Sequence, residues 1–124
     1  MATQGQTNRE TFIAGADLSA KQFTFVIMNT VDRTVVAAGN AAAADGIVIN
    51  KPASGEAATV VTFGRTMVLA GTGGLTAGAL IGCDAAGLGV VAATGDIVLG
   101  KVVDAGAAAG YATIDFQRGG NAAA

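Results

Sequence analysis

Residues 21–38 (KQFTFVIMNTVDRTVVAA) decide the fold, because their side chains alternate in two short runs on either side of a turn. In the first run Phe23, Phe25 and Ile27 fall on one face, and the residues between them fall on the other. A period of two is typical of a β-strand. The stretch therefore predicts a β-hairpin with its turn at residues 31–33.

The rest of the chain repeats this pattern of short β-rich runs between turns. Further strands are expected at residues 11–13, 47–49, 58–70, 79–83, 88–92, 97–103 and 111–117. In the last run Ala112, Ile114 and Phe116 are expected to face inward. In the long run Val61 and Phe63 are expected to share one face, with a bulge at Gly64.

Turn signals recur about every 8–12 residues, and no long helical period interrupts them. The alanine-rich stretch 39–46 offers at most a helical turn. This pattern predicts an all-β chain with a small single-domain β-barrel or β-sandwich-like fold built from short strands. The domain is expected over residues 11–118, between a flexible N-terminal arm at 1–10 and a flexible tail at 119–124.

Small side chains dominate the composition. Alanine occupies 28 and glycine 19 of the 124 positions, while hydrophobic residues make up 52% and charged residues 13%. Burial stabilises by about 25 cal/mol per Å² of apolar surface, so a core of small side chains makes a marginal monomer. We therefore expect further burial against partner copies.

Charge and hydropathy exclude two classes of partner. The net charge is −2 and the cations are scattered, which leaves no basic patch for nucleic acid. Residues 66–83 carry no charge, but five glycines and three threonines favour strand–turn–strand over a membrane helix. Residues 1–10 are polar and lack the apolar segment of an export signal.

Nothing in the sequence forms a site for catalysis, a cofactor or a metal. The chain has no histidine, which is the commonest general base and metal ligand. Its single cysteine, Cys83, has no activating partner and is expected to pack near a turn. Asp84 is expected to stabilise a turn by accepting from backbone amides. The chain is therefore not expected to be an enzyme.

Four segments resemble, in the same order, the small capsid decoration (cement) proteins of tailed bacteriophages. They are residues 15–23, 47–60, 75–87 and 100–110, and together they span about residues 12–117. In the second segment an apolar run is followed by Asn-Lys-Pro, then Gly-Glu, and then a strand. Each segment alone is common, and the ordered set carries the resemblance.

The resemblance implies a compact β protein on the outer surface of a phage head, made in the host cytoplasm and often trimeric. It would bind the major capsid protein between subunits and stabilise the shell. An arm that adds a strand to an exposed sheet edge would supply contacts. The expected capsid or subunit interface residues are Thr3, Gln4, Gln6, Thr7, Arg9, Thr11 and Phe12.

Two other classes remain open from the sequence. One is another virion structural subunit, either a head fibre or a tail protein. The other is a ligand- or carbohydrate-binding β module. Such modules usually present exposed aromatic side chains, whereas this chain has no Trp and one Tyr, and its phenylalanines are expected on apolar faces.

Overall fold

Nine β-strands and no helix make up the described part of the chain, which is residues 8–39, 43–93 and 97–117 of the computed structural model. The strands in chain order are β1 (Asn8–Ala14), β2 (Thr24–Met28), β3 (Thr34–Ala37), β4 (Gly46–Val48), β5 (Ala57–Leu69), β6 (Leu80–Cys83), β7 (Gly89–Val91), β8 (Gly100–Asp104) and β9 (Tyr111–Gln117). The predicted all-β class in one small domain is confirmed. No membrane-spanning helix occurs within those described ranges.

The first five strands close into a barrel. Their order around the ring is β1-β3-β2-β4-β5, and β1 also pairs with β5, which completes the circle. All pairs are antiparallel except β1 with β3, which are parallel at Ile13 and Ala14. Closure pairs the backbone groups that an open sheet would leave at its edges.

A second barrel shares β5 with the first. From β5 the sheet continues through β9, β8 and β6 to β7. A parallel bridge between Ala70, which follows β5, and Gly89 of β7 completes this ring, and the Gly71 amide donates to the Gly89 carbonyl at 2.8 Å.

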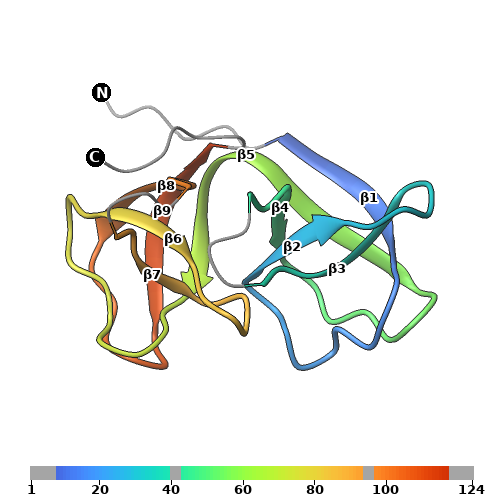
Figure 1. Cartoon of the computed structure of the whole chain (residues 1–124), viewed down its shortest axis with the longest axis horizontal. Coiled ribbons are helices and arrows are strands. Elements are labelled where there is room, and N and C mark those ends of the chain that lie inside the picture. Colours follow the sequence, from blue (N-terminus) through green and yellow to red (C-terminus); the bar gives the residue numbers. More distant parts are fainter. Residues whose placement is uncertain (1–7, 40–42, 94–96, 118–124) are drawn as a thin grey trace.

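The long strand β5 belongs to both barrels and arches from one to the other. Its first half pairs with β1 and β4, and its second half pairs with β9. Gly64 lies where the partners change and has a φ of 112°, a conformation that glycine adopts without steric cost. Figure 1 shows the two barrels on either side of this arch.

Two hydrophobic clusters fill the fold. The smaller lies inside the first barrel and includes Phe12, Val26 and Val60. The larger fills the second barrel and also takes in Phe25 and Ile47 from the outside of the first. β2 is therefore covered on both faces, by the smaller cluster on one side and by the larger cluster on the other.

Local predictions agree well with these strands. The predicted hairpin is β2 with β3, which are antiparallel with Val26 opposite Ala37. In β9 Ala112, Ile114 and Phe116 are buried and the residues between them are not, as predicted. The β1 strand begins at Asn8, so residues 8–10, which were expected in the arm, belong to the sheet.

One side-chain orientation was predicted wrongly. Val61 is buried, but Phe63, expected on the same face, is 52% exposed. The register of β1 against β5 shifts between Asn8, opposite Phe63, and Arg9, opposite Val61. Thr62 is therefore an extra residue on β5, so the bulge lies at Thr62 and not at Gly64 as predicted. This bulge interrupts the alternation on which the predicted orientation of Phe63 depended.

Candidate interaction surface

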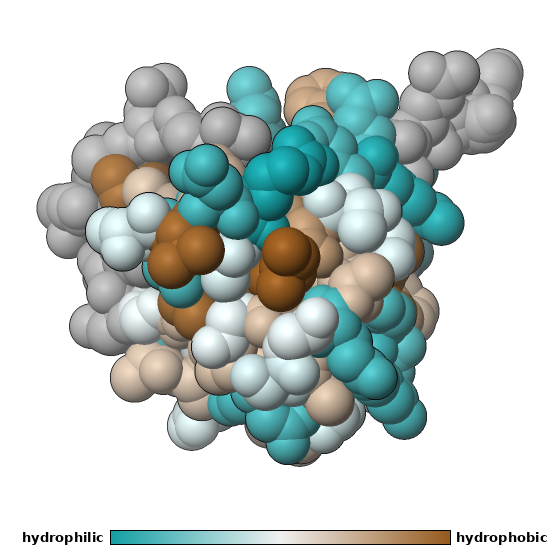
Figure 2. All heavy atoms as spheres, turned by 90° about the vertical axis from the view of Figure 1, so that its right-hand side faces the viewer, coloured by the Kyte–Doolittle hydropathy of each residue, from teal (hydrophilic) through white to brown (hydrophobic). Residues whose placement is uncertain are grey.

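The exposed large hydrophobic side chains fall into two groups, and one further residue, Val91 of β7, belongs to neither. Four lie on the second barrel: Phe63, Met67, Leu80 and Tyr111, which are between 40% and 52% exposed. Three lie in or beside the β2–β3 turn of the first barrel: Ile13, Met28 and Val31. On the side that carries β1 and β3, hydrophobic atoms form small separate groups among hydrophilic ones (Figure 2).

The first group lies on a surface that we call the outer face. It consists of the outward residues of four neighbouring strands: Phe63, Arg65 and Met67 of β5, Tyr111, Thr113, Asp115 and Gln117 of β9, Lys101 and Asp104 of β8, and Leu80 of β6. Side chains opposite one another on paired strands point to the same side. The alternation along β5 and β9 therefore places these residues together.

An ion pair lies at the centre of the outer face. Arg65 is opposite Asp115 in the β5–β9 register, and its Nε donates to Oδ1 at 3.0 Å while Nη2 donates to Oδ2 at 3.4 Å. This hydrogen bonding and the charge of Asp115 raise the pKa of Arg65. Both side chains are about half exposed, so the pair orders the surface more than it stabilises the fold.

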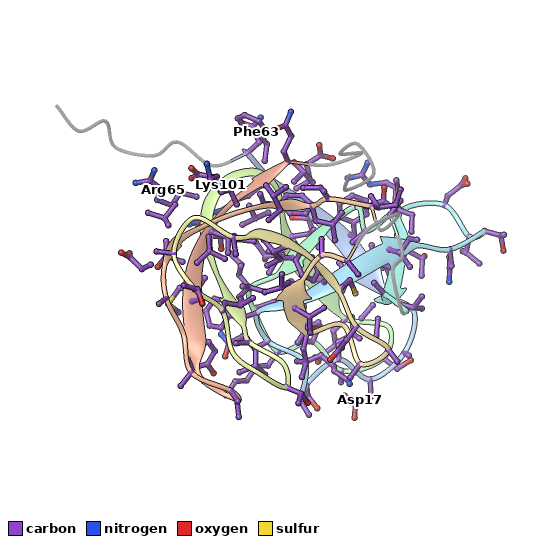
Figure 3. The ribbon with its side chains drawn as sticks, turned by 60° about the vertical axis from the view of Figure 1, so that its left-hand side comes forward. Asp17, Phe63, Arg65 and Lys101 are labelled. Carbon is purple, nitrogen blue, oxygen red and sulfur yellow. The ribbon has the colours of Figure 1, made fainter. Side chains whose placement is uncertain are left out.

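Lys101 extends this row across the sheet. It lies opposite Asp115 on one side and Leu80 on the other. The Lys101 side chain makes no hydrogen bond or ion pair within the described ranges. Figure 3 shows Phe63, Arg65 and Lys101 gathered at one end of the molecule, with Asp17 at the opposite end.

Loops that contain acidic turn residues form the Asp17 end. The Ser19 amide donates to Asp17 Oδ1 at 3.0 Å, and hydrogen bonding with Ser19 lowers the pKa of Asp17. The Leu18 amide donates to the Pro52 carbonyl, which ties this turn to the loop after β4. These carboxylates close turns by accepting from nearby amides.

Asp84 takes the same role in the β6–β7 turn. Its Oδ1 accepts from the amides of Ala86 and Leu88 at 2.8 and 2.9 Å, which confirms the predicted turn. The neighbouring Cys83 is buried, and this burial, together with the charge of Asp84, raises its pKa to about 12. Its thiol therefore stays protonated at neutral pH, as expected of a packing residue.

No metal-ligand cluster of three or more His, Cys, Asp or Glu side chains occurs within residues 8–39, 43–93 and 97–117. Within the same ranges, exposed Phe, Tyr, Met and Arg side chains lie together on the outer face. Aromatic, Met and Arg side chains are enriched in protein interfaces. The outer face is therefore suited to binding another protein.

None of the interface residues predicted from the sequence is among the residues that form the outer face. Thr3, Gln4, Gln6 and Thr7 lie outside the described residues. Arg9 and Thr11 are exposed on β1. Phe12 is only 5% exposed in the core of the first barrel, with the Arg33 guanidinium 5.4 Å from its ring centroid, and so offers little surface to a partner.

Sequence reasoning missed Phe63, Arg65 and Lys101 as surface residues. The alternation of Phe63, Arg65 and Met67 along one strand was a visible signal that β5 has an outward face. The approach of Arg65 to Asp115 was not visible, because these residues are 50 positions apart and only strand pairing brings them together.

The fold and this surface define a class: a small all-β domain of two fused barrels with a face of exposed hydrophobic and charged side chains on one of them. No known protein family and no curated protein sequence matches the chain. A solved structure does match it, the crystal structure of head fiber gp8.5 N base in bacteriophage phi29. The likeness has a TM-score of 0.73 at 15% sequence identity, covering 95% of this chain and 100% of the other. It establishes a shared fold.

Proposed function

We propose that this chain is a structural protein of a bacteriophage head that binds the outer surface of the capsid between major capsid subunits and stabilises the shell. The observation that carries the proposal is the fold shared with the head fiber base over nearly the whole of both chains. The four ordered segments that resemble capsid decoration proteins support it independently. Both resemblances are to proteins of phage heads.

The architecture suits a protein that acts by contact alone. Two closed barrels give a rigid body, and the outer face offers hydrophobic and charged groups for a modest interface. Many copies on one shell would multiply such contacts through their number. We also propose that the protein catalyses no reaction, which is consistent with a Cys83 thiol that is buried and protonated.

Self-association as a homotrimer is part of the proposal. A cyclic trimer joins two different patches, one from each neighbour. The two groups of exposed hydrophobic side chains lie on different barrels, which meets this requirement. Sedimentation analysis should give a trimer, or a monomer in exchange with it. A dimer whose fraction does not change with concentration would contradict this part of the proposal.

Add-back to phage heads tests the function directly. Heads of the phage that encodes this chain, purified from a mutant lacking it, are mixed with the purified protein and imaged by electron cryomicroscopy. We expect density on the outer surface at subunit junctions, and a higher temperature of DNA release from the decorated heads. Density at the tail, or no binding to intact heads, would contradict the proposal.

The likeness to the head fiber base favours a second candidate, a domain that anchors a fibre to the head. The same images separate the two functions. A decoration protein ends at the height of the domain and raises the stability of the shell. A fibre base carries density that projects further from the head and leaves the DNA-release temperature unchanged.

A further inference from the structure

Phe23 has a backbone conformation that a bulky side chain rarely adopts. The Thr24 amide donates to the Lys21 carbonyl at 3.2 Å, which makes Phe23 the third residue of a tight turn, with a φ of 64°. Turns with a positive φ at this position usually have Gly or Asn there. The Phe23 amide donates to the Val48 carbonyl at 2.7 Å, and its carbonyl accepts from the Leu69 amide at 2.8 Å. Strain of this kind persists where surrounding contacts impose it, and it is concentrated at clamps and switch regions.

The Phe23 ring contacts the second barrel. It packs edge-on against Tyr111 of β9, with 5.4 Å between the ring centroids and 81° between the ring planes, a favourable geometry for two aromatic rings. Leu69, which donates to the Phe23 carbonyl, is the last residue of β5 and lies opposite Tyr111. The turn before β2 is therefore joined to the end of β5 and to the start of β9.

The β6–β7 turn makes a second contact between the barrels, close to the first along the chain of β2. The Gly87 carbonyl of this turn accepts from the Phe25 amide at 2.8 Å, and its Ala86 carbonyl accepts from Lys21 Nζ at 3.5 Å. A Cβ on Gly87 would lie 3.0 Å from the Phe25 carbonyl oxygen, so the turn lies directly against β2. We use the name latch for the contacts of Lys21, Phe23 and Phe25 with Leu69, Tyr111 and the β6–β7 turn.

Within the described ranges, β5 is the one strand that carries the chain from the first barrel to the second, since β1–β4 precede it and β6–β9 follow it. Its pairing with β1 ends at Phe63, and its pairing with β9 starts at the same residue. Gly64 follows, with its φ of 112°, and glycine changes backbone conformation at little steric cost. Figure 1 shows this crossing at the top of the β5 arch, with the latch at the arrowhead that ends β5. A single crossing at a glycine is an arrangement typical of a hinge.

Between the hinge and the latch, Phe25 and Ile47 of the first barrel pack in the larger cluster, which favours the closed arrangement. We propose that Gly64 and the latch form a conformational device, in which the second barrel rotates about Gly64 when the latch opens and the strain at Phe23 is released. Rotation changes the angle between the outer face and the exposed hydrophobic side chains in or beside the β2–β3 turn. One chain can thereby fit both surfaces to partners at different spacings. The open form is rare, so unfolding by urea stays a single step.

Hydrogen exchange under native conditions tests this movement on the purified wild-type chain. The Phe25 and Leu69 amides donate to carbonyls across the latch, so its opening exposes them to solvent. The amides of Val60 and Ile114 lie within the β1–β5 and β5–β9 pairs and exchange only when a barrel unfolds. We expect Phe25 and Leu69, corrected for intrinsic rates, to exchange about 10-fold faster than Val60 and Ile114, with a weaker dependence on urea. Equal protection and equal urea dependence of all four amides would overturn the proposal.

Variants of the latch separate the effect of the ring from that of the strain. Phe23→Ala removes the ring and keeps an unfavourable positive φ, whereas Phe23→Gly removes both the ring and the strain. Both should speed exchange of the Phe25 and Leu69 amides, and Phe23→Ala should do so several-fold more than Phe23→Gly. Tyr111→Ala should also speed these two amides. The matched control, Leu80→Ala, removes a hydrophobic side chain that is 45% exposed at the end of β6 far from the β6–β7 turn and should leave them unchanged.

Two results with these variants would overturn the device. Wild-type exchange rates in Phe23→Ala or Tyr111→Ala would mean that the ring pair does not hold the barrels closed. Faster exchange in Phe23→Gly than in Phe23→Ala would mean that no strain is released at Phe23 when the latch opens.

Discussion

Replacing Phe25 with alanine tests whether the two barrels unfold as one unit. Phe25 belongs to β2 of the first barrel and is fully buried. Its ring centroid lies 6.0 Å from that of Phe116 in the second barrel. Truncating a buried phenylalanine costs about 3–5 kcal/mol. With a urea m-value of about 2 kcal/mol per molar, the midpoint of unfolding should fall by about 2 M.

Two spectroscopic probes make this experiment decisive. Far-ultraviolet circular dichroism reports on both barrels, whereas tyrosine fluorescence reports on the second, because the chain has no Trp and its single tyrosine, Tyr111, belongs to β9. We expect both probes to give one common transition in the wild type, and both midpoints to fall together in Phe25→Ala.

A core substitution confined to the first barrel serves as the comparison. Phe12 belongs to the smaller cluster only, yet Phe12→Ala should also lower both midpoints if unfolding is cooperative. The reasoning is refuted if the fluorescence midpoint of either variant stays at its wild-type value while the dichroism curve separates into two steps. That result would mean that sharing β5 and the larger cluster does not couple the barrels.

Three further outcomes are expected. Cys83 should react with iodoacetamide far more slowly in the folded protein than in urea at pH 8, since at a pKa of about 12 only about one thiol in ten thousand is ionised; mass spectrometry of timed samples checks this, and equal rates would contradict the burial. Gly46→Ala should destabilise the protein by about 1–3 kcal/mol, because a Cβ there would lie 2.7 Å from a backbone carbonyl oxygen of β5, whereas Gly39→Ala, with open space around it, should leave the urea midpoint unchanged. Arg65→Ala should also leave that midpoint almost unchanged, because the ion pair with Asp115 is exposed; a large loss in the same titration would mean that the pair holds β5 to β9.

Local patterns explain why much of the fold could be predicted. The alternation in residues 21–38 and 111–117 specifies strand, face and turn within a few positions, and the structure reproduces the hairpin and the buried face of β9. All predicted strands are present, with boundaries that agree to within three residues. These features depend only on neighbours along the chain.

The closure of the barrels depends on contacts that are remote in sequence and could not be predicted in this way. No local pattern shows that β1 pairs in parallel with β3 and also with β5. The outward turn of Phe63 follows from a bulge that forms only because of that pairing. The outer face was missed for the same reason, since its ion pair forms only after strand pairing has brought Arg65 opposite Asp115.

Asn8 of β1 and Gln117 of β9 pair with Phe63 from opposite sides of β5, so the two ends of the described domain lie close together. A linker of about four residues is long enough to join the two positions, and new ends could then be opened in the loop at residues 51–54. Such a circular permutant should keep the wild-type fold while its termini emerge among the Asp17-end turns. For a protein displayed on a particle, that rearrangement decides whether a fused cargo is trapped against the particle or presented to the medium.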